Sequence, residues 1–418
     1  MKLNPGYKQT EIGTIPDTWD VVPIGDLLTE FRGGAPLKPS DFTDIGVKVL
    51  PKGGVGRTGW LQIADSDLKF CSPEYAAANH RSQVDKTYTI VVLRDLVPSG
   101  PSIGLMVQIR GQDTFILAQG VYGFKVNESV VPGYLVQLSN THWYRTLANS
   151  IMVGSTQVHI TNTAFKLTKI PLPPLAEQEA IAGALSDADA LIEALEQLIA
   201  KKRQVKQGAM QELLTGKRRL PGFRRKWENK RLGDIANFFK GKGLSKSVIS
   251  KDGARKCILY GELFTKYKER IQEIASYTDV GDDAFLSQSN DVLMPTSDVT
   301  PNGLATASCI QEDGVIIGGD ILVIRSKDIN GIFLSYMIGY QRTQILQLVT
   351  GTTVYHLYAS DMRKFSFSVP TLEEQTAIAA VLSDMDAEIA ALEAKLAKTR
   401  LIKQGMMQEL LTGRIRLL

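Results

Sequence analysis

Few residues in this sequence have the type and spacing that catalysis or cofactor binding requires. Gly54, Gly56 and Gly59 match the glycine pattern of dinucleotide-binding turns, but Trp60 and a polar stretch follow where an apolar helix is needed. The four histidines and three cysteines are scattered, without the spacing of metal ligands or of a disulfide framework. A nucleotide-binding P-loop pattern is absent. The sequence therefore predicts a chain with no cofactor, no metal and no catalytic centre of its own.

Cations next to glycines point to another kind of chemistry, contact with phosphate groups. Flexible backbone and positive charge act together in such loops. The net charge of +4 permits nucleic-acid binding without requiring it. A denser basic run at 217–231 holds eight lysines and arginines against Glu228 alone, and it is equally typical of a solvated face. The candidate phosphate contacts are Arg32, Lys52, Arg57, Lys240, Lys242 and Lys246.

The elements that position these residues are organised around a segment that occurs twice. Residues 175–219 and 372–416 align at a constant offset of 197 without a gap and are identical at 29 of 45 positions. Such self-similarity indicates duplication. Each copy is rich in helix-forming residues, lacks proline, and repeats apolar residues three and four positions apart. The predicted apolar seam consists of Ile181, Leu185, Ile192, Leu195 and Ile199 in the first copy, and Ile378, Leu382, Ile389, Leu392 and Leu396 in the second.

Each copy therefore predicts one long helix, about 58 Å in length at 1.5 Å per residue. Gly216 and Gly413 stand where a left-handed residue ends a helix, and Thr371 with Glu374 predicts a capping box. Both helices must bury their seams. The economical solution is an antiparallel pair within the chain, related by a pseudo-twofold axis. Helices docked on separate cores, or dimerisation between chains, are the alternatives.

Two regions of mixed strand and helix character alternate with the long helices. The phrase WDVVPIGDLLTEFRGG from Trp19 is repeated as WENKRLGDIANFFKGK from Trp227. Runs such as VKVL, YTIVVL, CILYGELF and DVLMPTSDV predict strands, and residues 132–151 and 330–349 each predict a helix. The phrases GSTQVHIT and GTTVYHLY then stand at matching positions before the long helices. Their histidines, His159 and His356, have either a structural role there or a DNA contact.

The expected fold class is α+β, with two mixed α/β domains alternating with two long helices that pack as an antiparallel coiled-coil spacer in a pseudo-twofold internal repeat. Residues 1–18 should then lie close to the carboxyl terminus. No apolar run approaches the roughly 18 residues of a membrane span, so a cytoplasmic location is expected. The expected order is an N-terminal segment (1–18), a first α/β domain (19–171), a first spacer helix (172–216), a basic linker (217–226), a second α/β domain (227–369), and a second spacer helix with the C-terminal tail (370–418).

Several phrases at the domain junctions resemble those of a known family. They are TEIGTIPDTW, IPLPPLAEQEAIAGALSDAD, QELLTGKRRLPGF, VPTLEEQTAIAAVLSDMD and QELLTGRIRL. They are similar to the DNA-specificity (S) subunit of type I restriction-modification systems, and the resemblance covers essentially the whole chain. YGELFTKY, residues 260–267, is similar to one class of target-recognition domain in that family.

The resemblance implies a non-catalytic subunit that binds double-stranded DNA sequence-specifically. Each target-recognition domain would read one half of a bipartite, asymmetric target, and the helix pair would act as a ruler between the half-sites. The helices would dock two modification (methyltransferase) subunits, which bind S-adenosylmethionine, and restriction (translocase/endonuclease) subunits would join later. Further candidate DNA contacts are Thr156, Tyr260 and Thr353.

Two other classes of function stay open. A non-catalytic scaffold with two modules would bind proteins instead of DNA, and DNA affinity that falls steeply with salt would argue against it. A catalytic fragment with an unrecognised active site would methylate or cleave DNA as the purified chain alone.

Overall fold

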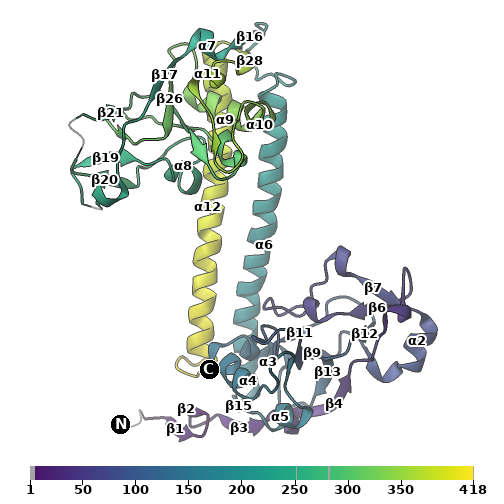
Figure 1. Cartoon of the computed structure of the whole chain (residues 1–418). Helices are drawn as coiled ribbons and strands as arrows, with labels where there is room; N and C mark the ends of the chain where they lie inside the picture. Colours follow the sequence, from purple (N-terminus) through teal and green to yellow (C-terminus); the bar gives the residue numbers. More distant parts are fainter. Residues whose placement is uncertain (1–4, 251, 281–282, 418) are drawn as a thin grey trace. The chain divides into compact units, whose positions relative to one another are not determined.

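The computed structural model of the protein describes residues 5–250, 252–280 and 283–417 (Figure 1). The chain divides into two compact units. Unit 1 contains residues 1–196 and 394–418, and unit 2 contains residues 197–393. Each unit combines one mixed α/β globule with part of each of two long helices. The predicted alternation of globules and helices is confirmed.

The two long helices carry the repeated segment. Helix α6 spans Leu175–Leu213 and helix α12 spans Leu372–Leu410, 39 residues each. At 1.5 Å per residue each helix is about 58 Å long, as expected. Gly216 and Gly413 follow with φ angles of +68° and +71°, which confirms their prediction as left-handed residues beyond a helix end.

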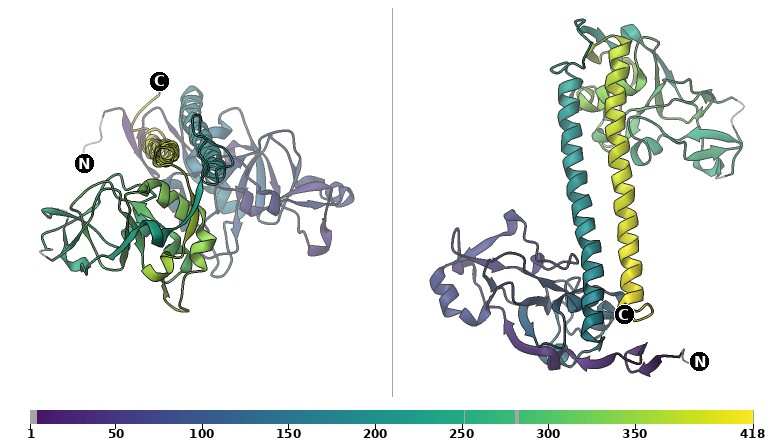
Figure 2. Two further views of the ribbon diagram at one scale, coloured as in Figure 1. Left: turned by 90° about the horizontal axis from the view of Figure 1, so that it is seen from above. Right: turned by 180° about the vertical axis from the view of Figure 1, so that it is seen from behind.

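In both units the α6 and α12 segments lie side by side and antiparallel (Figures 1 and 2). In unit 1, Asp189 of α6 forms an ion pair with Lys403 of α12. In unit 2, Lys206 of α6 pairs with Asp386 of α12 at 2.7 Å. Residues late in one helix thus meet residues early in the other, so the predicted antiparallel pairing within one chain is confirmed.

The predicted seam residues differ in how completely they are buried. Ile192, Leu392 and Leu396 are half-buried. The seam residues near the start of each helix pack into a globule core as well: Ile181 and Leu185 in unit 1, Ile378 and Leu382 in unit 2. The fully buried seam residues are Ile181, Leu185, Leu195, Ile199, Ile378, Leu382 and Ile389.

The globule of unit 1 contains two sheets and three separate strand pairs. A four-stranded antiparallel sheet has the order β11-β9-β13-β4, and a five-stranded sheet has the order β5-β7-β6-β12-β8, in which β6 and β12 are parallel. The separate pairs are β1–β2, β3–β15 and β10–β14. The strands are β1 (Tyr7–Thr10), β2 (Gly13–Pro16), β3 (Asp20–Pro23), β4 (Leu28–Gly33), β5 (Phe42–Thr43), β6 (Val47–Leu50), β7 (Lys69–Cys71), β8 (Gln83–Val84), β9 (Thr89–Val92), β10 (Arg94–Asp95), β11 (Met106–Gln108), β12 (Phe115–Leu117), β13 (Val121–Val126), β14 (Val158–His159) and β15 (Lys169–Leu172). The helices before α6 are α1 (Ile24–Leu27), α2 (Pro73–Ala78), α3 (Pro132–Ser139), α4 (His142–Ser150) and α5 (Asn162–Leu167).

The globule of unit 2 has a four-stranded sheet of order β17-β26-β22-β24 and a five-stranded sheet of order β18-β20-β19-β25-β21, with β19 and β25 parallel. Two separate strand pairs, β16–β28 and β23–β27, complete it. The strands are β16 (Glu228–Arg231), β17 (Asn237–Lys240), β18 (Ile249–Ser250), β19 (Arg255–Ile258), β20 (Ser276–Thr278), β21 (Phe285–Leu286), β22 (Val292–Pro295), β23 (Ser297–Asp298), β24 (Ser308–Cys309), β25 (Ile316–Ile317), β26 (Ile321–Arg325), β27 (Tyr355–His356) and β28 (Ser366–Val369). The helices are α7 (Leu232–Ile235), α8 (Glu262–Thr265), α9 (Gly331–Tyr340), α10 (Arg342–Leu346) and α11 (Ala359–Met362).

The two globules share their strand order although their sequences have diverged. The order β11-β9-β13-β4 corresponds to β24-β22-β26-β17, and β5-β7-β6-β12-β8 corresponds to β18-β20-β19-β25-β21. The parallel pair of each five-stranded sheet occupies the same place. Duplication therefore extends strand by strand through the globules, beyond the repeat that the sequence reveals.

Three local predictions were wrong. The helix predicted over 132–151 is two helices, α3 and α4, because the Thr141 hydroxyl accepts a hydrogen bond from the Tyr144 N–H and caps a new helix. The helix predicted over 330–349 is likewise α9 followed by α10. The last three residues of the predicted CILYGELF strand belong to helix α8, because the Glu262 carboxylate accepts from the Leu259 N–H and turns the chain.

The first residues of the described chain lie against its last turn, as the pseudo-twofold axis predicted. The Tyr7 hydroxyl donates to the Gly413 carbonyl at 2.9 Å, and Arg416 Nη2 donates to Thr18 Oγ1 at 2.9 Å. This prediction also covered residues 1–4 and 418, which lie outside the residues that the structure describes.

Candidate nucleic-acid interface

In unit 1, the central strand β9 delivers a loop to the surface. At its end the Leu93 N–H donates to the Gly120 carbonyl at 3.0 Å, and the Leu93 carbonyl accepts from the Ile160 N–H at 2.8 Å. The loop that follows is closed by Asp95, whose carboxylate accepts from Ser102 Oγ at 2.6 Å. We define residues 94–102 and 153–161 as tip 1, since β10 pairs with β14 between them.

Tip 1 gathers several polar side chains. Arg94 Nη2 donates to Gln157 Oε1 at 2.9 Å, and both residues are exposed. Lys52 lies beside Arg94, because a Cβ at Gly120 would meet Arg94 Cβ at 2.8 Å and Lys52 Cε at 3.0 Å. Burial lowers the pKa of Lys52. Of the predicted candidates, Thr156 belongs to tip 1 and Lys52 lies beside it, whereas Arg94 and Gln157 were not predicted from the sequence.

Unit 2 builds the equivalent loop on β22 with the same backbone bonds. The Thr296 N–H donates to the Asp320 carbonyl at 2.9 Å, and the Thr296 carbonyl accepts from the Leu357 N–H at 3.0 Å. Asp298 holds the loop by accepting from Thr300 Oγ1 at 2.9 Å. We define residues 297–305 and 350–358 as tip 2, which includes the exposed candidate Thr353.

Tip 2 has Ser297 and Val354 where tip 1 has Arg94 and Gln157. Apolar side chains are exposed on both tips, and on tip 1 these are Leu96, Val97 and Val153. Val299 is 71% exposed, Tyr358 is 54% exposed and Val354 is 44% exposed. Asp320 adopts φ +59°, at the place where unit 1 has Gly120 at φ +89°. A non-glycine residue in this region is strained, and such strain often marks a functional site.

The remaining candidates for phosphate contact differ in their exposure and in whether an acidic side chain already pairs with them. Arg32 is turned inward, donating to Glu30 at 2.6 Å and to the Gln83 carbonyl at 2.5 Å. Lys240 lies 3.6 Å from Asp320, and Lys242 lies 2.6 Å from Asp283. The candidates whose residues are exposed are Arg57, Lys240, Lys242, Lys246 and Tyr260.

A sequence signal for the two tips was present. The pattern Asp-x-x-Pro-x-Gly begins at Asp95 and again at Asp298, each time separated by two residues from the end of a buried strand. Its aspartates tie the loop, and its exposed positions are free to vary. A search for repeats within the diverged globules would have found it.

The repeated Glu-Gln pair at the start of each long helix is a clasp. In unit 1 the Glu177 carboxylate accepts two hydrogen bonds from Arg416, at 2.6 and 2.7 Å, and one from the Trp19 indole at 2.9 Å. Burial raises the pKa of Glu177, but the bonds from Arg416 and Trp19 outweigh it and leave the pKa below its usual value. Gly413 lies over this indole, with room for no larger residue beside Pro16.

Unit 2 repeats the clasp with residues that are close in the chain. The Glu374 carboxylate accepts two hydrogen bonds from Arg219, both at 2.6 Å, and one from the Trp227 indole at 3.1 Å. This corrects the predicted capping box. The Thr371 hydroxyl does accept from the Glu374 N–H at 3.4 Å, but the Glu374 carboxylate turns to the arginine.

The neighbouring glutamines dock the globules onto the helices. Gln178 Oε1 accepts from the Val131 N–H at 2.9 Å, just before α3. Gln375 Oε1 accepts from the Asn330 N–H at 2.8 Å, just before α9. Each clasp therefore fixes its globule to a helix start, and through the sheets it fixes the tip.

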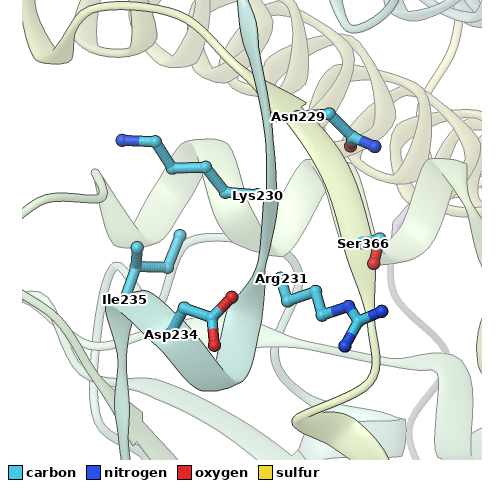
Figure 3. A pocket seen from close by; sticks show the side chains of 6 residues that line it. All are labelled: Asn229, Lys230, Arg231, Asp234, Ile235 and Ser366. Atoms are coloured by element: carbon cyan, nitrogen blue, oxygen red, sulfur yellow. The ribbon is translucent and has the colours of Figure 1, made fainter.

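Unit 2 also carries a polar hollow of about 620 Å³ beside strands β16 and β28 (Figure 3). Asn229, Lys230, Arg231, Asp234, Ile235 and Ser366 line it. A second hollow of about 560 Å³ shares Arg231 and adds Arg363 and Lys364. The basic run at 217–231 thus continues into a cationic surface of this unit.

The remaining chemical groups of the described residues are the cysteines and the possible metal ligands. The three cysteines are buried and unpaired, and burial raises the pKa of Cys257 to about 11 and that of Cys309 to about 12. Within residues 5–250, 252–280 and 283–417 no group of acidic, histidine or cysteine side chains could hold a metal ion. Over the same residues, no helix is both long and apolar enough to cross a membrane.

Two globules of one topology, each clasped to an antiparallel helix pair and each presenting one loop tip, define a duplicated two-module protein. A family model described as type I restriction modification DNA specificity domain matches residues 16–204 and 224–399. The chain belongs to this family. Its role accordingly lies in DNA sequence specificity within a type I restriction-modification system.

Relatives with the same organisation support this assignment. The chain is 27% identical to a putative type I restriction enzyme specificity subunit, MjaX, of Methanocaldococcus jannaschii, over 98% of this chain and 96% of the relative. It is 28% identical to the MjaVIII specificity subunit of the same organism, over 51% of this chain and 49% of that protein. A crystal structure of an S subunit from M. genitalium has the same fold, with a TM-score of 0.62 at 14% identity, covering 98% of each chain.

Proposed function

We propose that this chain is the non-catalytic DNA-reading subunit of a type I restriction-modification complex, and that its two recognition domains each read one half of a bipartite, asymmetric target. One observation carries the proposal. The two globules share strand order and clasp, yet differ at tips 1 and 2. A shared fold with two different exposed surfaces suits two different half-sites. The shared residues would position each domain on the DNA, and the exposed residues would determine which bases it recognises.

In this proposal residues 19–171 and 227–369 are the recognition domains, and residues 172–216 and 370–418 form the spacer that sets the half-site separation. The unbroken helices α6 and α12 support it, since a helix has a fixed rise per residue. Ion pairs such as Lys206–Asp386 hold their register. Residues 1–18 close the frame and residues 217–226 link its halves.

The helices also offer surface for partner subunits. Apolar side chains are exposed along them: Leu191, Leu198, Val205, Leu401 and Ile402. Contiguous apolar surface marks docking sites, and Leu191, Leu198 and Val205 recur seven residues apart, so they share one face of α6. We propose that they receive two modification subunits, which supply S-adenosylmethionine and adenine methylation, and that restriction subunits bind the assembled complex.

Phosphate contacts complete the proposal. Arg57, Lys240, Lys242 and Lys246 are exposed cations, while Lys52, Thr156, Tyr260 and Thr353 contribute at or near the loops. Arg32 is the weakest candidate, because it is engaged by Glu30 and Gln83 within unit 1.

A methylome tests this function. The chain is expressed with its matching modification subunit in a host that lacks adenine methylation, and the modified adenines are mapped. A single split motif with a fixed gap is expected. A four-residue insertion after Ala194 should change the gap while both half-sites persist. Absence of methylation from a complex shown to assemble would refute the proposal.

A further inference from the structure

We infer that tips 1 and 2 are the base-reading surfaces of the two units, with Arg94 and Gln157 reading one half-site and Val299, Val354 and Tyr358 reading the other. The inference rests on the proposed function and deepens it. It assigns sequence readout to particular side chains, apart from the cations that would contact phosphate.

The two tips have the same backbone support. Leu93 in unit 1 and Thr296 in unit 2 form the same backbone hydrogen bonds on both sides, to Gly120 and Ile160 and to Asp320 and Leu357 respectively. The strand before each loop is fully buried. Side chains on a rigid strand end keep a fixed position, which hydrogen bonding to base edges requires.

The two tips share the residues that hold their loops but differ at some exposed positions. Asp95 and Asp298 hold the loops in both, followed at equal spacing by a proline and a glycine. Two outward positions differ in chemistry: Arg94 corresponds to Ser297, and Gln157 to Val354. A third, Leu96 in tip 1 and Val299 in tip 2, is exposed and apolar in both. Docking of two identical protein subunits would favour the same outward residues in both units. Half-sites of different sequence favour different ones.

Tip 1 carries side chains that can form hydrogen bonds with base edges. An arginine can bond both acceptors of guanine in the major groove, and a glutamine can pair with adenine. The 2.9 Å hydrogen bond from Arg94 Nη2 to Gln157 Oε1 orders both side chains before DNA arrives. Such ordering reduces the entropy that binding would otherwise cost. Tip 1 therefore fits a half-site position occupied by a purine.

Tip 2 carries apolar side chains at its base-reading positions. Val299, Val354 and Tyr358 are 71%, 44% and 54% exposed on tip 2, and Val354 stands where tip 1 has the polar Gln157. The apolar feature of the major groove is the thymine methyl group. Thr353, on the same loop, adds a hydroxyl that can bond a base or a phosphate. Tip 2 therefore fits a half-site that contains thymine.

The experiment uses the complex of the full chain with its modification subunit. Binding is measured to the cognate duplex and to duplexes with single base-pair changes at each half-site position, at two salt concentrations. Arg94→Ala and Gln157→Ala should each lower discrimination at one position of one half-site by roughly 5- to 150-fold. Val299→Asn and Val354→Asn should act only on the other half-site. Arg81→Ala, which removes an exposed arginine of unit 1 outside the tips, is the control.

Each other outcome counts against the inference in its own way. Unchanged discrimination in all four variants would overturn it. Uniform weakening across all duplexes, with a smaller salt slope, would make Arg94 a phosphate contact. Failure to bind the modification subunit would make the tips a protein-docking surface. If the unaltered complex shows no sequence preference, the proposed function itself fails.

Discussion

Unit 1 and unit 2 have the same fold but carry different residues on their exposed loop tips. They share strand order and the Glu-Arg-Trp clasp, while tip 1 carries Arg94 and Gln157 where tip 2 carries Ser297 and Val354. The difference follows from burial. Glu177 and Glu374 are buried carboxylates that need their arginines, because an unpaired buried charge is strongly destabilising. Exposed tip residues such as Arg94 and Gln157 carry no such constraint, so they can differ between the two units.

The clasps themselves differ in how the chain supports them. In unit 2, Arg219 and Trp227 are separated by a short linker, so the chain itself holds them near Glu374. In unit 1, Trp19 and Arg416 come from opposite ends of the chain, and Glu177 binds both. Unit 1 therefore depends on its clasp more than unit 2 does.

The largest effect is expected from breaking the clasps. Arg416→Ala leaves Glu177 buried without its cation and should lower the local stability of unit 1 by about 3–5 kcal/mol. Arg219→Ala should cost unit 2 less, because the linker still holds Trp227 nearby. Hydrogen exchange at residues 7–19 and 220–227 measures both. Arg414→Ala, which removes only an exposed pair with Glu409, is the control. Equal losses in the two units would contradict the comparison.

The seam residues should give a smaller and unequal effect. Leu195 is 4% exposed, whereas its counterpart Leu392 is half-buried. Leu195→Glu places a charge in a buried site and should lower the free energy of unfolding by about 3 kcal/mol, and Leu392→Glu by about 1 kcal/mol. Urea unfolding of both single variants and of the pair measures this. An unchanged unfolding curve for Leu195→Glu would argue against the seam.

A cation that only unit 2 possesses should affect DNA affinity modestly. Lys242 stands where unit 1 has Gly34, and its pair with the exposed Asp283 leaves it accessible to phosphate. Lys242→Ala should weaken binding roughly threefold for all sequences and reduce the salt slope by about 1. Lys201→Ala, on an exposed face of α6, is the control. A loss confined to the cognate duplex would show that Lys242 reads a base.

The smallest effect is expected from mild acidification. The folded pKa of Glu177 lies below its ordinary value, so its clasp stabilises unit 1 above the unfolded carboxyl pKa of about 4.3 and loses this contribution only as the pH falls through the folded pKa. Stability attributable to this residue should stay constant from pH 8 to pH 5 and decline below that range. Urea unfolding of the parent and of Glu177→Gln over this range compares them. A decline already at pH 6 that Glu177→Gln removes would contradict the assignment.

The sequence predicted the helices well and the candidate site only in part. Gly216 and Gly413 end the helices as expected, because left-handed backbone is a local property of glycine. Lys52 was found from its glycine neighbours, but Arg94 was not, since its only sequence signal is the Asp-x-x-Pro-x-Gly pattern that begins beside it at Asp95 and recurs at Asp298. Arg32 has the same glycine neighbourhood as Lys52 yet turns inward to Glu30.

By itself the sequence determined the duplication, the two long helices and their apolar seam, because identity at a fixed offset and apolar periodicity are both written along the chain. The tertiary structure alone decided that Glu177 meets Arg416, that Arg94 meets Gln157, and that two diverged globules share one strand order. These contacts join residues far apart in sequence. They arise only when the sheets and helices pack, and buried charges then select their partners.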